Sequence, residues 1–253
     1  MKSQGPGDTS WEVSAKSYGA LVGQKGSYYH QAVIFPNLLQ LMAVKPSDTV
    51  LELGCGQGVL SRLLPPQTTY FGLDASETLI KEAQKRKGKH HAYFKFQDVT
   101  RPFKLTKSNF KHVVIILALQ NMRDLEAVIA NAKTHLHPKG KLWIVLNHPA
   151  FRIPKNSEWV TEEKRQSRLV HAYMSPQKIP IDMNPGAKTQ KKTTWSFHRP
   201  LSGYMAALKA HKLAVVDLQE WVSDKESEGK NAARENKARD EIPMFMLLVA
   251  MIH

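Results

Sequence analysis

Short apolar runs alternate with helical patterns in the first part of the chain. Residues 113–119 are apolar on both faces, which is typical of a central parallel strand. Alternation of this kind predicts an α/β fold, with a parallel sheet, right-handed crossovers and ligands at the carboxyl ends of the strands. The expected strands cover residues 50–53, 69–74, 91–96, 113–119 and 141–147, and helices are expected over residues 76–88 and 124–135.

The pattern is interrupted after residue 147 and resumes near residue 200. Prolines punctuate the interruption, which is longer than an ordinary connection between elements. Within it the sequence predicts a helix over residues 158–173 and an extended basic stretch over residues 188–197. Beyond it we expect a helix over 201–211, strands over 213–221 and 244–252, and a charged surface loop over 223–240.

A glycine-rich turn follows the first expected strand. Gly54, Gly56 and Gly58 let the backbone turn tightly beneath a ligand. Residues 59–64 supply the apolar face of a helix, which two prolines then end. Cys55, the single cysteine of the chain, is interpreted as a small residue that fits between the glycines rather than as a nucleophile.

Acidic residues accompany this turn. Asp74 and Asp98 end the second and third strands, where a carboxylate accepts hydrogen bonds from the hydroxyls of a ribose. Either aspartate alone is also compatible with a helix or turn cap, but together with the glycine turn they favour a nucleotide-type ligand. A dinucleotide site is disfavoured, because Val59 stands where its third glycine is required and Glu52 suits a cationic ligand better than a pyrophosphate.

From residue 48 to residue 147 the chain resembles the class I S-adenosylmethionine-dependent methyltransferases. The resemblance rests on Leu-Glu-Leu-Gly-Cys-Gly-Gln-Gly at 51–58 and on Leu-His-Pro-Lys-Gly-Lys at 136–141, which look most like the small-molecule, ubiquinone-biosynthesis-like branch. It implies S-adenosylmethionine as cofactor. It also implies a Rossmann-like, seven-stranded, mostly parallel sheet with helices on both faces, an N-terminal helical lid and an inserted cap after strand five.

The resemblance also implies which residues hold the cofactor. The glycine loop would meet its methionine part, and the acids after the second and third strands would bind its ribose and adenine amine. The loop after the fourth strand would lie along the sulfonium. The corresponding residues are Glu52, Gly54, Cys55, Gly56 and Gly58 for the glycine loop, Asp74 and Ala75 for the ribose, Asp98 and Val99 for the adenine, and Leu117 for the sulfonium.

Length and composition favour one methyltransferase domain. A chain of 253 residues with 42% hydrophobic residues can bury one large core. Residues 1–46 are expected to form the helical lid, 47–147 the cofactor-binding core, 148–200 the cap and 201–253 the last helix and two strands. In the lid, tyrosines including Tyr18 and Tyr29 either cover the site or simply pack.

Methyl transfer requires an oriented nucleophile and needs a base only if that nucleophile holds a proton at neutral pH. His148 follows the fifth strand and is a candidate base, although a capping or solvated histidine fits the same position. His198 and Arg199, where the cap rejoins the sheet, either meet an acidic or hydroxylated substrate or hold the cap in place. No metal site is expected.

The formal net charge of +14 favours anionic partners. Our leading hypothesis is a small-molecule acceptor, which an anionic group would suit. The alternatives are an RNA acceptor, suggested by Lys188, Lys191 and Lys192 beside Trp195 and Phe197, and a non-catalytic S-adenosylmethionine-binding protein.

The sequence also bears on the compartment. A single cysteine cannot form an intrachain disulfide, which suits a reducing compartment. The N-terminus lacks the apolar core of a signal peptide, and no uninterrupted apolar run approaches the length of a membrane span. The sequence therefore predicts a cytoplasmic protein without a membrane span, and it does not indicate an oligomeric state.

Overall fold

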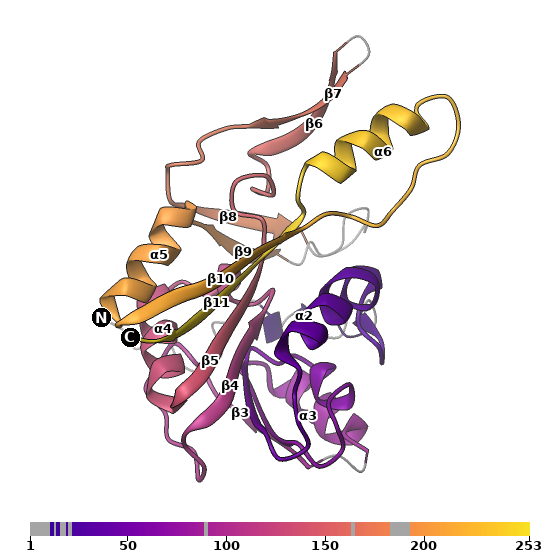
Figure 1. Cartoon of the computed structure of the whole chain (residues 1–253). Coiled ribbons are helices and arrows are strands. Elements are labelled where there is room, and N and C mark those ends of the chain that lie inside the picture. Colours follow the sequence, from indigo (N-terminus) through magenta and orange to yellow (C-terminus); the bar gives the residue numbers. More distant parts are fainter. Residues whose placement is uncertain are drawn as a thin grey trace.

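The computed structural model describes residues 11, 12, 14, 15, 19, 22–88, 91–162, 165–182 and 193–253. These residues contain a seven-stranded sheet with the strand order β10, β11, β5, β4, β1, β2, β3 (Figure 1). The strands are β1 (Thr49–Leu53), β2 (Thr69–Asp74), β3 (Ala92–Phe96), β4 (Phe110–Ile116), β5 (Leu136–Asn147), β10 (Leu213–Trp221) and β11 (Phe245–Ile252). Strands β1 to β5 pair in parallel, and β11 pairs antiparallel with both β5 and β10. The expected mostly parallel sheet is confirmed.

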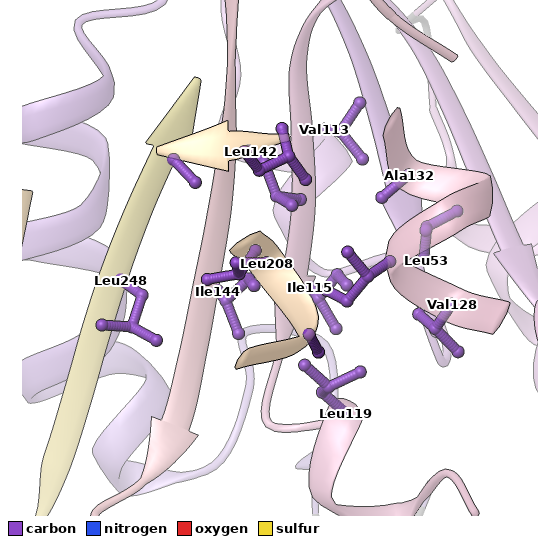
Figure 2. Close-up of a cluster of buried hydrophobic side chains, with 14 of the residues drawn as sticks. Leu53, Val113, Ile115, Leu119, Val128, Ala132, Leu142, Ile144, Leu208 and Leu248 are labelled. Carbon is purple, nitrogen blue, oxygen red and sulfur yellow. The ribbon is translucent and has the colours of Figure 1, made fainter. Parts of the chain in front are cut away.

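Helices cover both faces of this sheet (Figure 1). On one face, α4 (Leu125–His135) and α5 (Leu201–Ala210) pack on apolar side chains of the central strands. Figure 2 shows this core, in which Val128 of α4 and Leu208 of α5 lie over strand residues such as Ile115 and Ile144. On the other face lie α2 (Phe35–Met42) and α3 (Glu77–Arg86).

The helix starts follow from local sequence. The Ser76 hydroxyl accepts a hydrogen bond from the Leu79 amide at the start of α3, and the Asp124 carboxylate accepts one from Ala127 at the start of α4. Such caps satisfy amides that have no partner within the helix. The helix expected over residues 59–64 is reduced to a 3₁₀ turn, η2 (Leu60–Arg62), because the prolines that follow leave no room for further turns.

The helix predicted over residues 158–173 is wrong. The structure has a hairpin there, formed by β6 (Ser157–Glu162) and β7 (Arg165–Val170), in which Trp159 pairs with Arg168. The β-branched and aromatic residues of β6 favour an extended backbone over a helix. A second hairpin pairs β8 (Gln177–Asp182) with β9 (Thr193–His198), which confirms the extended conformation from residue 193, whereas residues 188–192 lie outside the described residues.

The surface loop predicted over residues 223–240 is also partly wrong. Residues of this stretch form α6 (Ala232–Glu241), whose one buried side chain is that of Ala238. This helix has no apolar stripe. It is stabilised instead by side-chain pairs one turn apart, such as Arg239 with Glu235. Figure 1 shows α6 beside the hairpin of β6 and β7, beyond the carboxyl end of β5.

The N-terminal part is helical, as expected. The described residues at 11, 12, 14, 15, 19 and 22 have helical backbone, and a π-helical turn, η1 (His30–Ile34), runs directly into α2. Helix α2 buries Phe35, Leu38 and Met42 against the sheet. The Tyr18 position lies outside the described residues. None of the helices in the described part of the chain is long and apolar enough to cross a membrane.

Candidate functional site

The glycine loop follows β1 and is hydrogen-bonded to the end of β2. The amides of Gly54 and Cys55 both donate hydrogen bonds to the Leu73 carbonyl, at 2.8 and 3.0 Å. Gly54 and Gly58 have φ angles of 77° and 70°, which L side chains rarely adopt. A Cβ atom on Gly54 would lie 2.6 Å from the Cβ of Ala118, in the loop after β4. The loop therefore needs glycine both for its conformation and for its close approach to β4.

Glu52 is buried at the end of β1, and the Tyr70 hydroxyl donates a hydrogen bond to its carboxylate. Burial raises the pKa of Glu52 to about 8, against the opposing effect of the Tyr70 hydrogen bond. Beside it the Cys55 thiol is also buried, and burial raises its pKa well above the ordinary value. Cys55 thus lacks the thiolate character of a nucleophile.

These groups line a pocket between the sheet and the N-terminal helices. The glycine loop contributes one wall, and the N-terminal helices and the end of β4 contribute the others. The lining residues are Val22, His30, Phe35, Glu52, Gly54, Cys55, Gly56, Gln57, Val59, Leu60 and Ile116. Burial lowers the pKa of His30 to about 4, so this wall carries no positive charge at neutral pH.

Asp74 connects the glycine loop to helix α3. One carboxylate oxygen accepts the Gly56 amide and the other accepts the Ser76 amide, both at 2.8 Å. Burial, together with the nearby carboxylate of Glu12, raises the pKa of Asp74 to about 6 against the opposing effect of the two amide bonds. Each oxygen keeps a second acceptor position, so Asp74 can also accept hydrogen bonds from a ligand.

Asp98 and Val99 lie in the turn that follows β3. One oxygen of the Asp98 carboxylate accepts hydrogen bonds from the amide and the hydroxyl of Thr100, at 2.9 and 2.6 Å. The other oxygen pairs with Arg101 at 3.4 Å. Val99 is buried in the core. The carboxylate of Asp98 therefore caps its own turn, as the alternative interpretation of the sequence had it.

Leu117 follows β4 with a φ angle of 50°, an uncommon conformation for a residue other than glycine. Its amide donates to the Val145 carbonyl, and its own carbonyl accepts from the side-chain amides of Gln120 and Asn121. The neighbouring Ile116 lines the pocket. A strained backbone held by several hydrogen bonds at this position is typical of a functional site.

The sequence around this site matches a family of known proteins. The family described as "Methyltransferase domain" matches residues 44–199, which include the glycine loop, Asp74 and the loop after β4. The chain belongs to this methyltransferase family. It is therefore an S-adenosylmethionine-dependent methyltransferase.

Solved structures agree with this assignment at the level of the fold. An S-adenosylmethionine-dependent methyltransferase from Mesorhizobium loti is 22% identical, with a TM-score of 0.66 over 85% of this chain and 95% of that one. A putative enzyme of the same kind from Listeria monocytogenes is 19% identical, with a TM-score of 0.65 over 86% and 97%. The glycopeptide N-methyltransferase MtfA, complexed with S-adenosylmethionine, is 16% identical, with a TM-score of 0.58 over 86% and 92%. No curated protein sequence matches the chain.

The residues of the methyltransferase fit this cofactor. The glycine loop leaves room where side chains would otherwise stand, and the pocket beside it carries the carboxyl group of Glu52. Asp74 supplies free acceptor positions at the next strand end. The pocket lining within the described residues includes Glu52, Gly54, Cys55 and Gly56, whereas Asp74, Asp98 and Leu117 lie at the adjoining strand ends.

Sequence reasoning missed how the N-terminal segment of the methyltransferase is fastened to this pocket. The Gln57 side chain donates to the Gly23 carbonyl at 2.5 Å, and Arg62 donates to the Gln24 carbonyl at 2.7 Å. Arg86 donates to the Gly23 carbonyl and to the Gln57 side chain. The only sequence signal was the position of Gln57 inside the glycine loop, since Arg62 and Arg86 lie in ordinary helical patterns.

Glu12 was also missed. Its carboxylate accepts hydrogen bonds from the hydroxyls of Ser76 and Thr78, both at 2.5 Å, so it lies at the start of α3. This places an N-terminal residue beside Asp74, and these hydrogen bonds lower the pKa of Glu12 although burial opposes them. The N-terminal segment thus contacts the site at both the glycine loop and the end of β2.

The structure gives His148 a partner on a distant strand. Its Nε2 lies 2.7 Å from a carboxylate oxygen of Glu220, and its Nδ1 accepts the amides of Ala150 and Phe151. Burial lowers the pKa of His148, although the hydrogen bond to Glu220 acts in the opposite direction. Both ring nitrogens are occupied, which matches the alternative of a capping histidine.

His198 and Arg199 hold β9 against neighbouring loops. The Nε2 of His198 donates to the Tyr173 carbonyl at 2.7 Å. The Arg199 guanidinium donates to the carbonyls of Met122 and Arg123, at 2.8 and 2.6 Å, and to that of Phe197 at 3.3 Å. These contacts match the second alternative, in which the two residues fix the insertion to the sheet domain.

We expect Arg199→Ala to lower the free energy of unfolding by about 2 kcal/mol, because it removes charge-assisted hydrogen bonds to three carbonyls. Urea unfolding measures this loss. Arg165→Ala is the matched control, since Arg165 is exposed on β7. Equal unfolding midpoints for the two variants would show that Arg199 does not anchor β9.

Proposed function

We propose that the methyltransferase transfers a methyl group from S-adenosylmethionine to a small-molecule acceptor that carries a negative charge. The observation that carries this proposal is the covered pocket. Val22, His30 and Phe35 of the N-terminal part face the glycine loop across it, and Gln57 and Arg62 fasten that part to the loop. A pocket enclosed in this way admits a small acceptor more readily than a folded nucleic acid.

The proposal gives each part of the site a role. The cofactor supplies an electrophilic methyl group on a positively charged sulfur. The glycine loop, from Glu52 to Gly58, would hold the methionine part, and Asp74 would accept hydrogen bonds from the ribose hydroxyls. Val99 and the Asp98 turn would lie beside the adenine, and Leu117 would face the sulfonium.

We also propose that no side chain of the chain acts as an obligatory base. A ring nitrogen of His148 is hydrogen-bonded to Glu220, and one of His198 is hydrogen-bonded to the Tyr173 carbonyl. The site would then work by holding the acceptor in line with the methyl group, which is sufficient when the accepting atom carries no proton to remove. His148, His198 and Arg199 would act as positioning residues.

Residues 1–46 would serve as a lid and residues 148–200 as a cap within one domain. The contacts of Glu12 and Gln57 support the first role, because they bring N-terminal residues onto the cofactor strands. The contacts of Arg199 support the second, because they join β9 to the loop after β4. The hairpin of β6 and β7 and helix α6 would complete the cap.

The RNA alternative has less support in the described residues. Base stacking would use the exposed faces of Trp195 and Phe197. Lys178 lies over the Trp195 ring at 3.9 Å, and Arg199 lies over that of Phe197 at 5.7 Å, so one face of each ring is covered. Lys188, Lys191 and Lys192, on which that alternative also rests, lie outside the described residues.

The test is transfer of a labelled methyl group to separate small-metabolite and RNA extracts. We expect label in the metabolite fraction and none in RNA. Label confined to RNA would overturn the small-molecule proposal. Label in neither fraction, with cofactor bound, would favour the non-catalytic alternative.

Cofactor binding itself is tested at Asp74. We expect Asp74→Ala to weaken binding of S-adenosylmethionine and of its demethylated product by roughly 1.5 to 3 kcal/mol, because charge-assisted hydrogen bonds to the ribose are lost. Calorimetry measures the affinity, and Asp74→Asn keeps the shape while removing the charge. Asp217→Ala, on β10 at the far edge of the sheet, is the control. An affinity of Asp74→Ala equal to that of the control would exclude the ribose role.

A further inference from the structure

Arg152 follows β5 and has no acidic partner among the residues that the structure describes. Its Nε atom is buried and has no hydrogen-bond partner in the part of the chain that the structure describes. Within the same residues, no carboxylate lies within ion-pair distance of its guanidinium. A half-buried cation of this kind is costly unless an anion compensates it.

A second guanidinium lies beside the first. Arg152 and Arg168 both lie against the Trp159 ring, at 5.6 and 5.3 Å from its centre. Burial and the charge of Arg168 both lower the pKa of Arg152. The Trp159 ring attracts both cations, and the Glu158 carboxylate raises the pKa of Arg168 against the effect of burial. The repulsion between the two guanidiniums would be relieved by an anion bound to both.

Arg168 is held rigidly in this arrangement. Its Nε donates to the Phe151 carbonyl at 2.8 Å, and one Nη donates to the carbonyl and the hydroxyl of Ser157, at 3.0 and 2.7 Å. The second Nη takes part in none of these bonds. The hairpin thus carries a fixed guanidinium whose remaining donors are available beside Arg152.

Chain connections relate this pair to the strands that form the cofactor pocket. The backbone of Arg152 is tied to His148, the residue after β5, by a hydrogen bond of 2.8 Å. Strand β5 pairs with β4, whose Ile116 lines the pocket. Tyr29 acts electrostatically on Arg152 and raises its pKa, and the next residue, His30, lines the pocket. Both guanidinium groups therefore lie beyond the carboxyl ends of the strands, the end of the sheet at which Ile116 of β4 contributes to the pocket.

We infer that Arg152, together with Arg168, binds a carboxylate of the methyl acceptor. The inference rests on the proposed function and names the substrate class for the same site: a small carboxylic acid. The planar guanidinium matches the two oxygens of a carboxylate. Both guanidinium groups lie against the Trp159 ring, which fixes their positions for this contact.

The experiment uses benzoate as the probe and benzamide as its neutral analogue. Calorimetry would measure the binding of each to the full chain, with and without the demethylated cofactor product. We expect benzoate to bind at least roughly tenfold more tightly than benzamide, because a charge-assisted hydrogen bond is lost in the amide. Arg152→Gln should remove this preference and leave the cofactor affinity unchanged, and Arg152→Lys should restore part of it.

Arg165→Gln is the matched control, because it removes one positive charge from the exposed part of the same hairpin. Equal benzoate affinities in Arg152→Gln and Arg165→Gln would overturn the inference, as would equal binding of benzoate and benzamide to the unaltered chain. The latter comparison needs no variant and holds even if Arg152→Gln fails to fold. Failure of the unaltered chain to bind the cofactor product would instead refute the proposed function, since benzoate binding is also measured without cofactor.

Discussion

Glu52→Gln is expected to remove the steepest part of the pH dependence of folding stability. The pKa of Glu52 is about 8 in the folded protein because of burial, against an ordinary value of 4.5. Between these values the folded state holds a proton that the unfolded state has released. Glu52 therefore adds stability that is complete below its unfolded pKa and is lost as the pH rises through its folded pKa, a change of about 5 kcal/mol in the unfolding free energy.

Urea unfolding at a series of pH values measures this effect as the difference between the unaltered chain and Glu52→Gln. The difference is needed because other groups titrate in the same range. Asp74, with a pKa of about 6, contributes with the same sign, whereas His148, whose pKa is lowered, contributes with the opposite sign. Glu226→Gln, at an exposed position, is the control. Parallel pH profiles for the unaltered chain and Glu52→Gln would show that Glu52 ionises normally in the folded protein.

The same burial bears on cofactor binding. A positively charged ligand beside Glu52 would favour the ionised carboxylate, so the group that weakens folding at high pH is also suited to a sulfonium-bearing ligand with an ammonium group. The Tyr70 hydroxyl, which donates to Glu52, keeps the carboxyl group satisfied when no ligand is present. The folding stability that the buried Glu52 loses at high pH can therefore be recovered when a cationic cofactor binds beside it.

The central sheet could be predicted from the sequence because its signals are local. Strands β1, β2, β4 and β5 contain the expected apolar runs, although β4 covers residues 110–116 rather than 113–119 and β5 begins at residue 136 rather than 141. Ser76 and Asp124 cap their helices through contacts only three residues away. The glycine loop could be predicted equally well, because its backbone conformation requires glycine. The hairpin of β6 and β7 was missed because its residues are half exposed and polar, so neither helical nor strand periodicity stands out.

The roles of individual polar side chains were less predictable. Position alone placed His148 and Arg199 near the strand ends, which is where they lie. Their hydrogen bonds reach partners far along the chain, such as Glu220 for His148 and Met122 for Arg199. Glu12 and Arg62 gave no signal at all, because their function depends on carbonyls and hydroxyls that only the folded chain brings within reach.

Gly54→Ala is expected to have a large effect on both folding and cofactor binding. The new Cβ would lie 2.6 Å from the Cβ of Ala118 and 3.0 Å from the side chain of Met122, at a backbone φ of 77°. Overpacking and the left-handed conformation together should cost about 3 kcal/mol of unfolding free energy. Movement of the loop to relieve the clash would displace the amides that bind the Leu73 carbonyl.

Gly229→Ala separates the effect of overpacking from the effect of the left-handed backbone conformation. Gly229 has a φ of 84°, but nothing lies within 4 Å of where its Cβ would stand. This variant should therefore lose only about 1 kcal/mol, from backbone strain alone, and keep its cofactor affinity. Gly54→Ala should lose more, and calorimetry should show cofactor affinity at least roughly tenfold weaker, because the pocket wall itself has moved. Equal losses of stability in the two variants, with cofactor binding intact in both, would mean that the approach of the loop to Ala118 is not what shapes the site.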